Sequence, residues 1–121
     1  MPKDNFLRVA SPEIGSLERS YILQALDAGE ISSQGKFVGE FEERFASDVG
    51  VKYALTTSNG TTALHLALLA AGVKSGDEVI VPSVTFVATA NAVTYIGAKP
   101  VFADINEKYW CIEPLKMQGL I

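Results

Sequence analysis

The chain has 121 residues and a formal net charge of −4, and 48% of its residues are hydrophobic. This length and composition predict about one globular domain with a small core. The sequence has no basic block, so it gives no support for a nucleic-acid interface. Cys111 is the only cysteine. It leaves no partner for a disulfide and no cluster for a metal, which predicts a reducing compartment.

Two features of the sequence bear on its location. The first eight residues lack the apolar stretch of a secretory signal. The longest apolar run, residues 63–73, is interrupted by His65 and is too short to cross a bilayer. These observations predict a cytoplasmic protein with no membrane segment.

Residues 1–50 predict two helices joined by a polar loop. Residues 11–13, Ser-Pro-Glu, are of the types that begin a helix, and apolar residues at helical spacing continue to Leu26. The composition of residues 29–35 is that of a loop. A second amphipathic helix is expected over residues 37–49.

After residue 50 the pattern changes to strands alternating with helices. We expect strands over residues 52–57, 79–82 and 101–104, and helices over residues 60–71, 85–96 and onward from Pro114. This order predicts an α/β fold with a parallel sheet and right-handed crossovers. Such a sheet would have exposed edges and a bare face. We therefore expect the chain to be the front part of a longer protein, or to be covered by a partner.

Five consecutive polar residues, 58–62 (Ser-Asn-Gly-Thr-Thr), stand between the first expected strand and its helix. The first amides of a helix lack internal partners and carry partial positive charge, so they suit a phosphate. Gly60 would allow close approach, and Thr61 and Thr62 add hydroxyl donors. The alternative is a helix that simply caps itself, and the pattern alone leaves both open. The loop matches neither Gly-x-Gly-x-x-Gly nor a Gly-Lys-Ser/Thr fingerprint.

The second strand-to-helix junction, residues 81–91, falls at the same expected edge of the sheet. Phe86 stands at the start of the following helix, where it could stack on a flat ring held beside the first junction. The alternative is ordinary packing, which the pattern alone favours.

Several motifs then occur in a fixed order: Gly35-Lys-Phe-Val-x-x-Phe-Glu42, Ser58-Asn-Gly-Thr-x-Ala-Leu-x-Leu-Ala-Leu68, Gly76-Asp-Glu-Val-Ile-Val-Pro82, Thr85-Phe-x-Ala-Thr-Ala-Asn-Ala92 and Gly97-Ala-x-Pro-Val-Phe102. Together they resemble the N-terminal part of the DegT/DnrJ/StrS family of sugar aminotransferases. Members of this family are pyridoxal 5'-phosphate (PLP) enzymes of the aspartate aminotransferase fold. The resemblance covers residues 12–121.

The resemblance implies the three-layer α/β sandwich of the fold type I major domain, incomplete in this chain. Residues 51–121 would then begin the large PLP-binding domain. Residues 1–50 would form a helical segment that carries a loop near the active-site mouth. In that loop, the resemblance places Ser32 and Ser33 near the substrate.

The resemblance also assigns roles at the two junctions. It implies that Gly60 and Thr61 cradle the cofactor phosphate, with Asn59 beside them. It implies that Phe86 stacks on the pyridine ring. No metal ligand follows from it.

The family's Schiff-base lysine lies in a Ser-x-x-x-His-Lys motif, and its pyridinium-binding aspartate lies in a Glu-Asp-Ala/Cys-Ala motif. Neither motif occurs in this sequence. The resemblance implies a parent enzyme that moves an amino group from an amino acid, glutamate by preference, to a keto-sugar nucleotide, and that acts as a homodimer. We expect the 121-residue chain alone to be inactive, with no catalytic residue of its own. We interpret His65, the only imidazole, as structural.

Three alternatives remain open at this point. The first is a non-catalytic truncated product that acts only as a binding or interaction module. The second is a Rossmann-like nucleotide-binding domain, although its glycine pattern is missing. The third is another PLP reaction on a sugar, such as dehydration or epimer chemistry.

Overall fold

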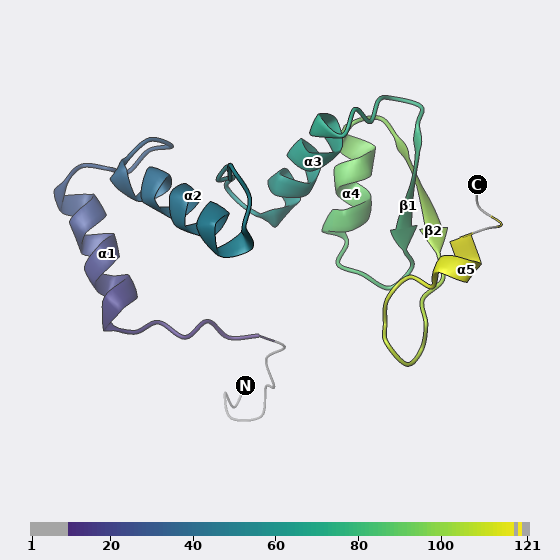
Figure 1. The fold of residues 1–121 in the computed structure, drawn as a ribbon, viewed down its shortest axis with the longest axis horizontal. Coiled ribbons are helices and arrows are strands. Elements are labelled where there is room, and N and C mark those ends of the chain that lie inside the picture. The colour runs from purple at the N-terminus through teal and green to yellow at the C-terminus, as the bar shows by residue number, and fades with distance from the viewer. Residues whose placement is uncertain (1–9, 118, 120–121) are drawn as a thin grey trace, which may run out of the picture. The chain divides into compact units, whose positions relative to one another are not determined.

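A computed structural model describes residues 10–117 and 119 of the chain (Figure 1). Two compact units make up the protein, residues 1–55 and residues 56–121. The helices and strands are α1 (Ser16–Asp27), α2 (Lys36–Val49), α3 (Gly60–Ala70), β1 (Glu78–Pro82), α4 (Ala88–Tyr95), β2 (Lys99–Ala103) and α5 (Pro114–Met117).

The first helix begins later than the sequence predicts. Residues 11–13 lie outside it, and α1 starts at Ser16 with Gly15 as its N-terminal flanking residue. The Gly15 N–H donates to a carboxylate oxygen of Glu18 at 2.7 Å, which satisfies one of the free donors of the helix end. A helix continuing through Gly15 would cost about 1 kcal/mol at that glycine. The helix therefore begins just after it.

The second helix confirms the prediction over residues 37–49. It ends at Gly50, whose φ of 74° lies in the left-handed region that glycine adopts at low cost. At its start, the Lys36 N–H donates to a carboxylate oxygen of Glu30 at 2.9 Å. This bond closes the expected polar loop.

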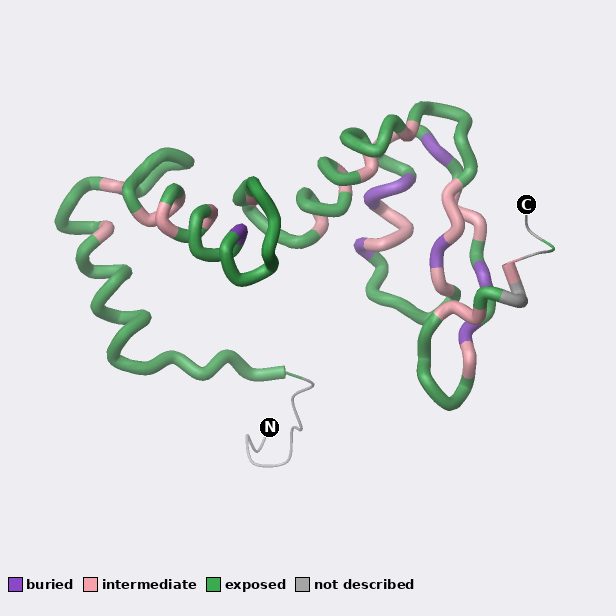
Figure 2. Tube along the Cα trace, in the orientation of Figure 1, coloured by how far each residue is buried: buried purple, intermediate pink, exposed green. Residues whose placement is uncertain are grey.

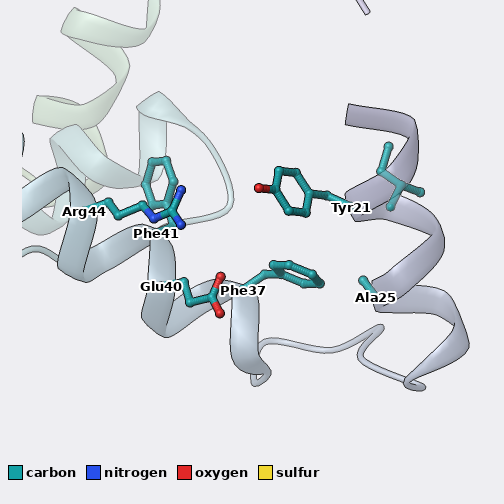
Figure 3. A pocket seen from close by; sticks show the side chains of 7 residues that line it. Tyr21, Ala25, Phe37, Glu40, Phe41 and Arg44 are labelled. Atoms are coloured by element: carbon teal, nitrogen blue, oxygen red, sulfur yellow. The ribbon is translucent and has the colours of Figure 1, made fainter. Parts of the chain in front are cut away.

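Contacts between aromatic rings join α1 to α2. The rings of Tyr21 and Phe37 meet edge to face, with centroids 5.5 Å apart. Beside them lies an apolar groove of about 370 Å³ between the two helices (Figure 3), lined by Tyr21, Ile22, Ala25, Phe37, Glu40, Phe41 and Arg44.

The second unit contains a two-stranded parallel sheet. Strands β1 and β2 pair in register from Glu78 with Lys99 to Pro82 with Ala103. At the first of these pairs the Lys99 ammonium donates to the Glu78 carboxylate at 2.8 Å. This hydrogen bond and the opposite charge raise the pKa of Lys99. Both side chains are exposed, so the pair contributes little to stability.

One predicted strand is not formed. Residues 52–57 lie in none of the strands that the structure describes, and β2 starts at Lys99 rather than at residue 101. Tyr53 and Leu55 are each 76% exposed. A β-strand forms only beside a second strand, and strand-like composition alone does not supply that second strand. The α/β class with a parallel sheet is confirmed.

The core of the second unit lies between the sheet and α4. Its buried centre consists of Val81, Val93 and Ala98, with Leu68, Val73 and Val79 packed against it. Helix α4 contacts both strands, and α3 contacts α4. Figure 2 shows most buried positions of this unit on α4 and the two strands. The predicted helices over residues 60–71 and 85–96 are confirmed as α3 and α4, although α4 starts at Ala88.

Two further features complete the fold. The helix expected near Pro114 is confirmed as the short α5, and residues 118 and 120–121 lie outside the described part. None of the helices among the described residues is long and apolar enough to span a bilayer.

The turn after α4 generates a stability prediction. Gly97 has a φ of 79°, and a Cβ added there would lie 2.8 Å from the Ser75 hydroxyl oxygen. We expect Gly97→Ala to lower the free energy of unfolding by about 1–2 kcal/mol, measured by urea titration. Gly39→Ala is the control, because Gly39 is inside α2 and a Cβ there meets nothing within 4 Å. It should stabilise by about 0.5–1 kcal/mol. A Gly97→Ala protein as stable as the wild type would contradict the backbone strain and the steric clash inferred at this position.

Candidate functional site

The polar junctions gather at one end of the second unit. Each of α3 and α4 precedes a strand through a short connection, so both helices run opposite to the strands. Their N-terminal ends therefore lie at the same end as the carboxyl ends of β1 and β2 (Figure 1). This is the edge at which open parallel α/β sheets bind ligands.

At the start of α3 a closed hydrogen-bond network forms around Asn59. The Asn59 side-chain oxygen accepts from the Thr62 N–H at 3.0 Å. The Asn59 N–H in turn donates to the Thr62 hydroxyl at 3.3 Å, so the two residues cap the helix reciprocally. The Asn59 amide nitrogen donates to the Ser58 hydroxyl at 3.3 Å. The network lets the chain enter a helix directly from an extended residue.

This network leaves a defined set of donors. Among the described residues, the N–H groups of Gly60 and Thr61 have no hydrogen-bond acceptor, and neither has the Thr61 hydroxyl. A Cβ built on Gly60 meets nothing within 4 Å, so the approach to these amides is open. Two adjacent N–H groups at the positive end of an eleven-residue helix can bind an anion.

The turn from β1 to α4 carries an aromatic residue. Phe86 lies in the turn before α4, whereas the sequence predicted it at the start of the helix, and it is 79% exposed. The turn is fixed on either side of the ring. The Ser83 N–H donates to the Ala103 carbonyl at 2.8 Å, and the Thr89 N–H donates to the Phe86 carbonyl at 3.0 Å. Phe86 is therefore a ring held on an ordered backbone without being part of the core.

The remaining candidates lie in the first unit. Ser32 and Ser33 are exposed in the loop between α1 and α2. The Ser32 hydroxyl accepts from the Gln34 N–H at 3.4 Å, which forms a small local turn. Within residues 10–117 and 119, no three His, Cys, Asp or Glu side chains gather in a way that could hold a metal ion.

The sequence predicted hydroxyl donors at Thr61 and Thr62, but it missed Thr57 and did not specify the acceptors of these hydroxyls. Thr57 and Thr62 both donate hydroxyl protons to the Asn59 carbonyl, at 3.0 and 2.8 Å. The spacing Asn59-x-x-Thr62 is a variant of the capping box and was a usable signal. Thr57 had no comparable signal, because its role depends on how the chain turns after it.

These features define an α/β protein in which the N-terminal ends of two helices lie at the carboxyl end of a parallel sheet. Residues 12–121 match the model of the DegT/DnrJ/EryC1/StrS aminotransferase family. The chain belongs to this family, as the motifs predict.

Three relatives illustrate the match. GDP-perosamine synthase of Caulobacter vibrioides is 50% identical over 115 residues, covering 95% of this chain and 31% of that protein. The aminotransferase of Psychrobacter cryohalolentis superposes with a TM-score of 0.83 at 36% identity, over 89% of this chain and 28% of that one. GDP-4-keto-6-deoxy-D-mannose-3-dehydratase of E. coli, solved with hydrated PLP, superposes with a TM-score of 0.81 at 30% identity, over 93% and 30%. The chain thus spans about 30% of the length of the relatives it matches.

Proposed function

We propose that the protein, as its gene encodes it, is a PLP-dependent aminotransferase. It moves an amino group from an amino acid, with glutamate as the first donor to test, to a keto-sugar nucleotide. The family match supports this proposal, as do the names of the GDP-perosamine synthase and the sugar dehydratase solved with PLP. The observation that carries it is the pair of unpaired amides at Gly60 and Thr61, at the edge of the sheet where such enzymes would hold a phosphate.

The α3 junction fits the cofactor phosphate. The Gly60 and Thr61 N–H groups would donate to phosphate oxygens, and the Thr61 hydroxyl would add a third donor. The positive end of α3 would favour the double negative charge. Asn59 would stand beside the phosphate as the cap that holds these donors in place.

Phe86 fits the cofactor ring. Its exposed ring on an ordered turn would stack against the pyridine and fix its plane. Once bound, PLP supplies an electron sink for the removal of a proton from the carbon that carries the amino group. The part of this chain in that chemistry is to bind and orient the cofactor.

Three further assignments belong to the same proposal. Ser32 and Ser33 would contact the substrate from their loop near the active-site mouth. The complete protein would act as a homodimer. It would reside in the cytoplasm, as the sequence predicts.

Dehydration of a sugar nucleotide is the second candidate, because a dehydratase of this fold is among the structural neighbours. The two reactions leave different products. Amino transfer from glutamate gives one 2-oxoglutarate for each amino sugar formed. In the dehydration the sugar loses a hydroxyl as water, while glutamate is oxidised to 2-oxoglutarate and its nitrogen leaves as free ammonia, so the sugar product is lighter by one oxygen and carries no amino group.

The decisive experiment supplies the complete gene product with PLP, glutamate and GDP-4-keto-6-deoxy-D-mannose. We expect equimolar 2-oxoglutarate and a GDP-linked amino sugar, measured by mass spectrometry. Isotopic nitrogen in the glutamate should appear in the sugar. A sugar product lighter by one oxygen and free of the label, with the labelled nitrogen in free ammonia, would favour dehydration. No product with any keto-sugar nucleotide or amino donor would reject both reactions.

Gly60→Ala tests the phosphate assignment. The Cα–Cβ bonds of a helix tilt toward its N-terminus, so the added methyl would stand where the phosphate approaches. We expect the affinity for PLP to fall about tenfold, as measured by absorbance titration of the cofactor-free protein. Thermal stability should not fall, since the new Cβ meets nothing within 4 Å and alanine favours the helix. Unchanged affinity would place the phosphate elsewhere.

Phe86→Leu tests the ring assignment. Loss of the aromatic face should weaken PLP binding by about 0.5–1.5 kcal/mol, because stacked aromatic pairs contribute that much beyond their area. Phe86→Tyr keeps the ring and should bind PLP like the wild type. Both affinities can be read from the cofactor absorbance. Equal losses in the two variants would argue against stacking.

A further inference from the structure

Thr62 is the third residue of α3, and its side chain touches the start of the helix rather than its exposed flank. We propose that Thr62 is a positioning residue for the cofactor phosphate: its hydroxyl fixes the peptide group whose N–H is the Gly60 donor. This inference rests on the proposed function, because it concerns the same phosphate site.

The argument begins with the peptide that joins Asn59 to Gly60. A peptide group is planar, so the carbonyl of Asn59 and the N–H of Gly60 point in opposite directions from one rigid unit. Whatever holds the carbonyl therefore aims the N–H. In this protein the carbonyl points toward the helix, and the Gly60 N–H is left to point away from it.

Three donors converge on the Asn59 carbonyl oxygen. The Thr62 hydroxyl donates at 2.8 Å, the Thr57 hydroxyl at 3.0 Å and the Ala63 N–H at 3.1 Å. The Ala63 bond is the ordinary first bond of the helix, whereas the two hydroxyls are additional. Hydrogen bonds to a carbonyl polarise its peptide, which strengthens the N–H on the other side as a donor.

The Thr62 hydroxyl acts on both sides of Asn59. It has one proton, and its shortest contact assigns that proton to the Asn59 carbonyl. Its lone pairs are then available to accept from the Asn59 N–H at 3.3 Å. Without this hydroxyl, the Asn59 N–H would become a third free donor beside Gly60 and Thr61. Removal of the hydroxyl would also leave the Asn59 carbonyl with two hydrogen-bond donors in place of three.

The test compares two ligands that differ only in the phosphate. The complete gene product, freed of cofactor, is titrated with PLP and with pyridoxal. The measured quantity is the dissociation constant of pyridoxal divided by that of PLP. Thr62→Val removes the hydroxyl and keeps the shape, and Thr62→Ser restores the hydroxyl. Thr94→Val is the matched control, because the Thr94 hydroxyl donates to the Asn91 carbonyl at 2.9 Å in the same three-residue relation within α4.

We expect Thr62→Val to weaken PLP binding about fivefold while pyridoxal binding changes less than twofold. Thr62→Ser should recover the wild-type ratio, and Thr94→Val should leave it unchanged. Thr57→Val should also lower this ratio, as Thr62→Val does, because it removes a donor to the same carbonyl. This second variant also decides the matter if Thr62→Val does not fold.

The outcomes separate the two levels of the proposal. Equal weakening of both ligands in Thr62→Val would assign Thr62 a general structural role and overturn the inference. So would an unchanged ratio in Thr62→Val, or in Thr57→Val if that is the only variant that folds. A wild-type protein that binds PLP no better than pyridoxal would overturn the proposed phosphate site itself, and the inference with it.

Discussion

The candidate site depends on one peptide group, which joins Asn59 to Gly60. Its carbonyl accepts three hydrogen bonds from Thr57, Thr62 and Ala63, and its N–H faces the open end of α3. A helix end normally exposes several free amides in varied directions. Here side chains engage the amides of Asn59 and Thr62, and the two amides between them remain. The hydrogen bonds within the protein therefore determine which amides remain free at the site.

The elements that sequence analysis located well are those with local signals. Helix α2 ends at Gly50, where a left-handed residue is required, and α3 starts at the polar residues that cap it. The predicted start of α1 was wrong. The prediction relied on three helix-starting residue types at positions 11–13 and did not use the spacing of Gly15 and Glu18, which marks the observed start. That spacing was also local and could have been used.

Other features could not be obtained from the sequence, because they depend on partners far along the chain. Residues 52–57 have strand-like composition but lie in none of the described strands. At the site, Gly60, Thr61 and Phe86 were predicted from motif and position, and their cofactor roles remain predictions. That Thr62 and Thr57 share one acceptor became visible only in three dimensions, since neither helical period nor composition specifies where a hydroxyl points.

The shared direction of α3 and α4 has an electrostatic consequence. Both helices present their N-terminal ends at the carboxyl edge of the sheet, so two partial positive charges reinforce each other there (Figure 1). The 121 residues carry a formal net charge of −4. The partial positive charge at this edge is therefore set against the net charge of the chain's side chains. It falls off within about one turn of each helix, so it favours an anion only over a short distance.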